Sequence, residues 1–380
     1  MKKFLAMLLA VVMTLALVAC GGGKDSNSSA FKVGGTGPLT GAAAIYGNAA
    51  ANGAKIAVDE INAMGGIQFE LNYQDDVHDA EKAVNAYNNL KDWGMQLSLG
   101  SVTSAPCNAT AAETYSDRIF ALTPSASAPT VIEGKDNMFQ MCFLDYPTQG
   151  GASAQYISDM KLGEKIAIIW KNDEDYSTGL RNSFVDRAAE LGLNIVSETT
   201  FTSDTSDFTV QLTEAQNAGA DLVFLPMYYQ PASLIFSQAN AMGYAPKWFG
   251  VDGMDGILTM EGFDPAMAEG VMLLTPFNAD SSDSKTQSFV KKYQELYGET
   301  PNQFAADAYD CIYAYKQALE ACNATPSMSA TELCDLMVKQ FTSMTFDGLT
   351  GTSMTWDSTG AVSKGAHGCI IENGVYVGLD

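Results

Sequence analysis

The sequence predicts an α/β fold made of two doubly wound parallel-sheet lobes. Short apolar segments alternate with amphipathic helical stretches along the chain, and 380 residues suit two domains better than one. Strands that alternate with helices form parallel sheets with helices on both faces. One sheet rarely holds so many βα units, and Met138–Pro147 is typical of an extended crossing between two sheets. We therefore expect a ligand to bind between two lobes.

In the first half, four apolar segments have the length and composition of strands. They are Phe31–Gly35, Ile67–Tyr73, Met95–Leu99 and Arg118–Leu122. Helices are expected between them at Asn48–Met64, Ala80–Leu90 and Ala109–Ser116. The first of these helices shows the pattern best, because Ala50, Ala54 and Ile61 recur on one face and Gly65 ends it.

The alternation is clearer in the second half. Strands are expected at Lys165–Trp170, Asn194–Glu198 and Asp221–Leu225, separated by helices at Gly179–Leu191 and Phe208–Ala218. Near the end, two short apolar segments flank Asn373-Gly374, the dipeptide that the tightest hairpin turns favour. The sequence therefore predicts a terminal hairpin of Cys369–Glu372 and Val375–Gly378.

The N-terminus indicates export. Residues 1–19 combine two lysines with an apolar run that is too short and too early for a spanning helix, as in a secretory signal peptide. Leu17-Val18-Ala19-Cys20 resembles a bacterial lipobox, which implies cleavage before Cys20 and lipid attachment to its thiol; the alternative is an ordinary signal with a chance cysteine. Residues 20–30 have the composition of a lipid-anchored flexible tether. We expect an exported protein anchored to the cell membrane by Cys20, at the bacterial surface or in the periplasm.

Charge and composition exclude several classes of partner and site. The formal net charge of −23 argues against nucleic acid, whose phosphates select basic surfaces. The two histidines, His78 and His367, lie far apart and no CxxC pair occurs, so we expect no metal site. Six further cysteines are either small buried residues or form one or two disulfides, whose pairing cannot be derived from sequence. They are Cys107, Cys142, Cys311, Cys322, Cys334 and Cys369.

No catalytic constellation is assembled in the sequence. Gly35-Thr36-Gly37 begins a dinucleotide fingerprint but lacks the third glycine at its spacing. The chain has neither a phosphate-binding P-loop nor the GxSxG motif of serine hydrolases. Paired carboxylates abound, as they must in so acidic a chain, and nearly all should be solvated. We expect a protein without cofactor that is not an enzyme.

Several stretches resemble, in matching order, the leucine/isoleucine/valine-binding protein family of ABC importers. They are Gly37–Ile67, Tyr73–Val84, Thr123–Pro129, Cys142–Gly150, Lys171–Leu180, Tyr228–Pro231 and Phe249–Gly253. The resemblance implies a type I periplasmic binding fold whose lobes are joined by a three-crossing hinge. It would place 31–146 and 277–351 in lobe 1, and 147–276 and 352–380 in lobe 2. It implies a solute-binding protein that captures a small amino acid, first of all a branched-chain one, and delivers it to a permease and its ATPase.

The resemblance also implies ligand-binding residues. Ser104, Ser125 and Ser127 match positions that hold the ligand carboxylate, which needs several donors. Asp252 matches an acidic position that pairs with the ligand ammonium; the best-known members carry glutamate there, and Asp255 is a nearby competitor. Isolated serines in such loops are more often caps and turn formers.

Aromatic residues would form the remaining wall of the pocket. Tyr46, Tyr176 and Tyr229 match aromatic positions, and Phe304 matches the aromatic against the ligand side chain. Tyr228 and Trp248 are expected neighbours of lower weight. Some family members carry a disulfide at the positions of His78 and Thr103, so that bridge is absent here.

Two alternatives remain open. A protein of the same fold could bind another amino acid, an amide or a small organic acid, and the placement of Asp252 discriminates between these ligands. A ligand sensor could use the same closure, although the sequence shows no extra signalling domain.

Overall fold

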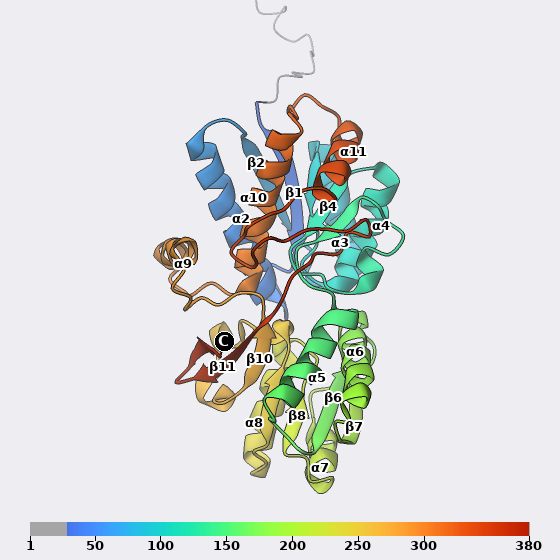
Figure 1. The fold of residues 1–380 in the computed structure, drawn as a ribbon, viewed down its shortest axis with the longest axis vertical. Coiled ribbons are helices and arrows are strands. Elements are labelled where there is room, and N and C mark those ends of the chain that lie inside the picture. The colour runs from blue at the N-terminus through green and yellow to red at the C-terminus, as the bar shows by residue number, and fades with distance from the viewer. Residues whose placement is uncertain (1–28, 380) are drawn as a thin grey trace, which may run out of the picture.

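The computed structural model describes residues 29–379, which form two lobes placed end to end along the long axis (Figure 1). The predicted signal peptide, Cys20 and most of the predicted tether lie outside the described residues. Within the described part of the chain, no helix has the length and apolarity needed to cross a membrane.

The first sheet is fully parallel and has the strand order β2-β1-β3-β4-β5. Its strands are β1 (Phe31–Gly37), β2 (Phe69–Asp75), β3 (Leu97–Leu99), β4 (Phe120–Thr123) and β5 (Met138–Gln140). The helices of this lobe are α2 (Ala44–Met64), α3 (Ala80–Trp93), α4 (Ser104–Asp117), α9 (Ser284–Tyr297), α10 (Gln303–Ala321) and α11 (Ala330–Phe341). Short η1 (Pro129–Val131) follows β4.

Helix α10 returns from far along the chain to pack against α2 (Figure 1). Gly53 makes this close approach possible, since a Cβ there would lie 1.9 Å from the backbone oxygen of Ala305. Both Phe304 and Tyr46 are carried by this helix pair, so the packing sets their separation.

The second sheet has the order β12-β11-β10-β9-β8-β6-β7. Its strands are β6 (Ile166–Lys171), β7 (Ile195–Phe201), β8 (Leu222–Phe224), β9 (Lys247–Gly250), β10 (Met272–Thr275), β11 (His367–Glu372) and β12 (Val375–Gly378). Among these described strands, β11 pairs antiparallel with both β10 and β12, and the other pairs are parallel. The helices are α5 (Gly150–Asp159), α6 (Asp175–Leu191), α7 (Thr209–Asn217) and α8 (Tyr229–Met242), with short η2 (Asp145–Gln149), η3 (Asp252–Met254), η4 (Ile257–Thr259) and η5 (Pro265–Ala268).

The terminal hairpin is confirmed. β11 pairs with β12 around Asn373 and Gly374, whose φ angles of 53° and 74° are those of a type I′ turn. The hairpin extends the second sheet at β10 rather than standing alone (Figure 1).

Two chain segments differ from the sequence expectation. Met138–Gln140, expected in the first crossing, is instead the buried edge strand β5, and the crossing follows it. Residues 352–362, expected in the second lobe, lie beside β5: the indole of Trp356 donates to the carbonyl of Gln140 at 2.7 Å, and the Gln140 N–H donates to the carbonyl of Gly360 at 3.0 Å. Trp356 is buried there, and burial of its large side chain explains why this segment stays with the first lobe. The remaining lobe boundaries stay a prediction.

The largest cluster of buried apolar side chains runs through both lobes. Among the described residues no disulfide forms; five cysteines are buried thiols and Cys322 is partly exposed. The thiols therefore act as small apolar core residues.

Candidate ligand-binding cleft

The predicted binding residues follow the carboxyl ends of strands from both sheets. Ser104 begins α4 after β3, whereas Tyr229 and Asp252 follow β8 and β9. The carboxyl ends of parallel strands share one edge, and that edge is where open α/β sheets bind ligands. All eight predicted side chains are at most 6% exposed; they are Tyr46, Ser104, Ser125, Ser127, Tyr176, Tyr229, Asp252 and Phe304.

The three serines form one cluster in the first lobe. The hydroxyl of Ser104 accepts a hydrogen bond from the N–H of Ala128 at 3.2 Å, which joins its loop to that of Ser127. Ser125 donates to the carbonyl of Val102 at 2.7 Å. The Ser127 hydroxyl is fully buried and has no hydrogen-bond partner in the part of the chain that the structure describes. Because buried polar atoms are nearly always hydrogen-bonded, this hydroxyl is available to a ligand.

Tyr46 brings the two lobes into contact. It lies on α2 of the first lobe, and its hydroxyl donates to the carbonyl of Gly253 and accepts from the N–H of Tyr229 at 3.1 Å in the second lobe. Its ring centroid lies 5.0 Å from that of Tyr229 and 4.3 Å from that of Phe304. Three of the predicted aromatic residues therefore form one apolar wall that spans the lobe interface.

Asp252 lies beside this wall and is held by neutral donors. One carboxylate oxygen accepts from the hydroxyl of Tyr176 at 2.5 Å and from the N–H of Gly253 at 2.8 Å. Burial raises the pKa of Asp252, and the hydrogen bond from Tyr176 opposes that rise. In the described part of the chain Asp252 forms no ion pair, so it is a buried carboxyl group without a cation.

Asp255, the competitor for the ammonium, is committed elsewhere. Its carboxylate accepts from the N–H of Gln303 at 2.8 Å, at the N-terminus of α10. The side chain is 5% exposed, and burial raises the pKa of Asp255 to about 7. Since α10 belongs to the first lobe, the Asp255 carboxylate joins the two lobes. The Asp252 carboxylate instead contacts Tyr176, one of the predicted pocket residues.

Sequence reasoning missed two glutamines at Asp252. The carboxamide of Gln303 donates to the carbonyl of Asp252 at 2.9 Å, and the oxygen of Gln149 accepts from its N–H at 3.3 Å. Gln149 lies in one of the stretches that carry the family resemblance, so its position could have been noted. Its role depends on contacts with a residue 103 positions away, for which the sequence carries no signal.

The two lower-weight neighbours separate. Tyr228 stacks on Tyr176 with ring centroids 4.5 Å apart and an interplanar angle of 9°, so it extends the aromatic wall. Trp248 packs instead against Phe236 and Tyr244 in the interior of the second lobe. Trp248 is therefore a core residue rather than a cleft residue.

A hydrogen bond joins His78 and Thr103 at the cleft edge, the two positions where the resemblance implies a disulfide in some family members. The Nδ1 of His78 lies 2.8 Å from the hydroxyl of Thr103. On its other side the Nε2 of His78 lies 3.7 Å from Glu174 of the second lobe. A cavity of about 640 Å³ lies beside this pair, lined from both lobes and bounded by Tyr228. The described residues contain no group of side chains that could hold a metal ion.

Comparison with known proteins places this geometry among binding proteins. A family model described as "Periplasmic binding protein" matches residues 30–367. A protein of Pseudomonas aeruginosa named "Amino acid binding protein" is 29% identical over 310 residues, which are 79% of this chain and 81% of that protein.

Two solved structures are similar over almost the whole of both chains. The leucine binding protein LivK of Thermotoga maritima has a TM-score of 0.83 and 25% identity, covering 92% of this chain and 98% of that one. The branched-chain amino acid transporter substrate binding protein LivJ of Streptococcus pneumoniae, solved with isoleucine, has a TM-score of 0.82 and 27% identity, covering 91% and 97%. The similarity therefore includes both lobes and the cleft between them.

Proposed function

The chain belongs to the periplasmic binding protein family and has its type I fold, and from this premise we propose that it is the extracytoplasmic solute-binding component of an ABC importer. Its ligand is a small amino acid, first of all a branched-chain one. The relative and the two solved structures named above support this class of ligand.

The placement of Asp252 carries the proposal. A buried carboxyl group without a cation costs free energy, and an ammonium group removes that cost. The first lobe offers hydroxyl donors at Ser104 and Ser127, which suit a carboxylate. A ligand that carries an ammonium and a carboxylate on one carbon can bind Asp252 of the second lobe and the serines of the first lobe at once. An α-amino acid has both groups.

Closure follows from this division. The carboxylate docks first on the serine loops, and the ammonium then reaches Asp252 when the lobes meet. Tyr46 bonds to Tyr229 and Gly253 across the lobes, so we expect these bonds to break when the lobes separate. The ligand therefore shifts the population toward the closed form.

The closed form is what we expect a permease with its ATPase to recognise. Lipid on Cys20 would keep the protein at the membrane, and residues 20–30 would act as the tether. Radiolabelled palmitate incorporation in wild type and Cys20→Ala tests the anchor, since only the wild type should be labelled.

A thermal-shift screen of residues 24–380 tests the ligand. The compounds are the common L-amino acids, their D-forms and the matching des-amino acids. A ligand that binds only the folded protein raises the melting temperature by mass action. We expect leucine, isoleucine or valine to raise it and the des-amino acids not to. A shift from carboxylic acids or amides alone would assign the fold to another ligand and refute the ammonium site.

A further inference from the structure

Gln149 has a buried carboxamide whose oxygen is hydrogen-bonded and whose nitrogen is not. It ends η2, where the chain enters the second lobe, and it is fully buried. Its carboxamide oxygen accepts from the N–H of Asp252 at 3.3 Å. Among the described residues its Nε2 is buried and has no acceptor at hydrogen-bonding distance, although the side chain also acts on the Asp252 carboxylate, whose pKa it helps to lower. Because an idle buried donor is costly, the group calls for an acceptor that arrives from outside the chain.

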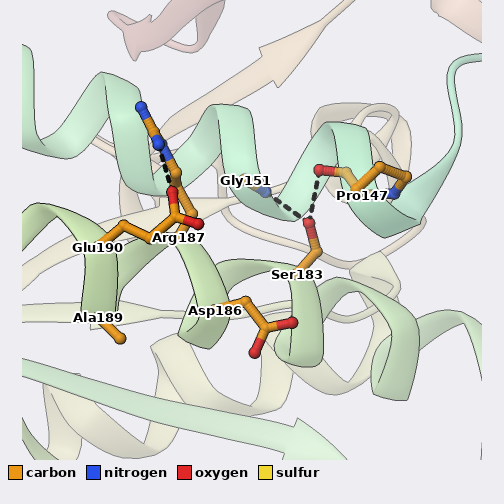
Figure 2. A pocket seen from close by; sticks show the side chains of 7 residues that line it. All are labelled: Pro147, Gly151, Ser183, Asp186, Arg187, Ala189 and Glu190. Carbon is orange, nitrogen blue, oxygen red and sulfur yellow. Dashed lines mark hydrogen bonds and ion pairs between the residues drawn. The ribbon is translucent and has the colours of Figure 1, made fainter.

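The surrounding backbone holds Gln149 in place. Figure 2 shows Ser183 of α6 bridging the turn on both sides of this residue: its hydroxyl accepts from the N–H of Gly151 at 2.8 Å and donates to the carbonyl of Pro147 at 2.9 Å. A Cβ on Gly150 would lie 2.2 Å from the carbonyl oxygen of Leu180, so the turn lies directly on α6. The glutamine is thereby fixed relative to that helix.

Helix α6 also carries Tyr176, whose hydroxyl donates to the Asp252 carboxylate. Gln149, Tyr176 and Asp252 thus form one frame within the second lobe. The N–H groups of the Gln149 carboxamide therefore lie close to Asp252, the proposed acceptor for the ligand ammonium, because the oxygen of the same carboxamide binds the Asp252 backbone. In an α-amino acid the carboxylate is bonded to the same carbon as the ammonium, so its oxygens are the ligand acceptors nearest to this frame.

We propose that Gln149 is a specificity-determining residue whose Nε2 donates to the α-carboxylate of the bound amino acid. This inference rests on the proposed function. The carboxylate is then held by serine donors of the first lobe and by Gln149 of the second. Because both lobes bind one group, the contact selects ligands that carry ammonium and carboxylate together, and it is complete only in the closed form.

The test compares two ligands on three proteins by fluorescence titration at pH 8. L-Leucine carries both charges, and isoamylamine carries the ammonium and the same alkyl chain without the carboxylate. We expect Gln149→Met, which removes the donor, to weaken leucine about tenfold and isoamylamine less than about threefold. Gln149→Glu keeps an acceptor for Asp252 and adds a negative charge, so leucine should weaken about a hundredfold and isoamylamine should not weaken.

Gln155→Met is the matched control, because Gln155 lies on α5 and binds Arg187 at the surface. It should leave both titrations unchanged. Equal weakening of leucine and isoamylamine in the Gln149 variants would show that Gln149 only positions Asp252, and no weakening would remove it from the site; either result overturns the inference. If wild type fails to bind leucine, the proposed function fails instead. Melting temperatures without ligand confirm that each variant is folded.

Discussion

Two buried aspartates, Asp307 and Asp252, differ in whether a cationic side chain pairs with them. Asp307 of α10 is 1% exposed, and the ammonium of Lys364 lies 2.7 Å from its carboxylate with no exposure of its own. Burial raises the pKa of Asp307 to about 6, against the opposing effect of Lys364. Asp252 is similarly buried, yet its carboxylate accepts from a phenol hydroxyl and a backbone N–H. One carboxylate has a cation supplied by the chain, and the other has none among residues 29–379.

The difference separates a structural from a functional carboxylate. Lys364 lies on the segment that leads to β11, so its pair with Asp307 fastens the last crossing to α10 of the first lobe. Asp252 lies at the end of β9 beside the aromatic wall. A buried pair is balanced only when both members are present. Removing a charge should therefore destabilise the fold at Asp307 and weaken ligand binding at Asp252.

The largest effect is expected from Lys364→Met. The substitution leaves Asp307 buried without its cation, which should lower the free energy of unfolding by about 4 kcal/mol. Urea unfolding of the ligand-free protein measures it. Lys316→Met, which removes an exposed pair with Glu320 four residues away, is the control and should cost no more than about 0.5 kcal/mol. Equal stabilities of the two variants would contradict the structural role of the pair.

Asp252→Asn should show the opposite pattern. It removes no existing ion pair, so the free energy of unfolding without ligand should stay the same or rise. Leucine binding should weaken by about 3 kcal/mol, or roughly a hundredfold, because the ammonium loses its only charged partner. Calorimetric titration measures the affinity, with Asp59→Asn on the surface of α2 as control. The comparison fails if leucine binds Asp252→Asn as tightly as wild type.

Asp255 adds a dependence on pH. Its folded-state pKa of about 7 lies above the ordinary value of 3.8, so the folded protein holds this proton more tightly than the unfolded chain does. The contribution of Asp255 to stability is therefore present at low pH and is lost as the pH rises through about 7.

The measurement is urea unfolding of wild type and Asp255→Asn at pH 5, 6, 7 and 8. Asparagine keeps an acceptor for the N–H of Gln303 and does not titrate. Relative to the variant, wild type should lose about 2 kcal/mol between pH 5 and pH 7. Parallel curves for the two proteins would show that Asp255 does not titrate in this range.

The sequence predicted the fold well because its signals are local. The apolar segments at Lys165–Trp170 and Asp221–Leu225 became β6 and β8 with shifts of one residue, and Asn373-Gly374 formed the expected turn. β5 was missed because a strand of three residues carries too little periodicity to be recognised. Residues 352–362 were misplaced because only tertiary contacts of Trp356 fix their position.

The candidate site divides in the same way. Motif positions brought Tyr46, Tyr229 and Phe304 together, as the resemblance implied. The hydrogen bonds of these residues were not predictable, because the hydroxyl of Tyr46 bonds to Gly253 in the other lobe, a contact that no local pattern indicates. The carboxamides of Gln149 and Gln303 converge on Asp252 from chain positions that no local pattern connects.

Tyr176→Phe is expected to have the smallest effect and sharpens the comparison most. The hydroxyl donates to Asp252 at 2.5 Å, and a hydrogen bond to a charged group contributes about 1.5 kcal/mol, so leucine should bind roughly tenfold more weakly. Because that bond acts through the carboxylate, the loss should disappear when Tyr176→Phe is added to Asp252→Asn. Calorimetric titration of the four proteins gives this double-mutant cycle. Additive losses would mean that Tyr176 contacts the ligand independently, and Asp252 would then lack the support that distinguishes it from a solvated carboxylate.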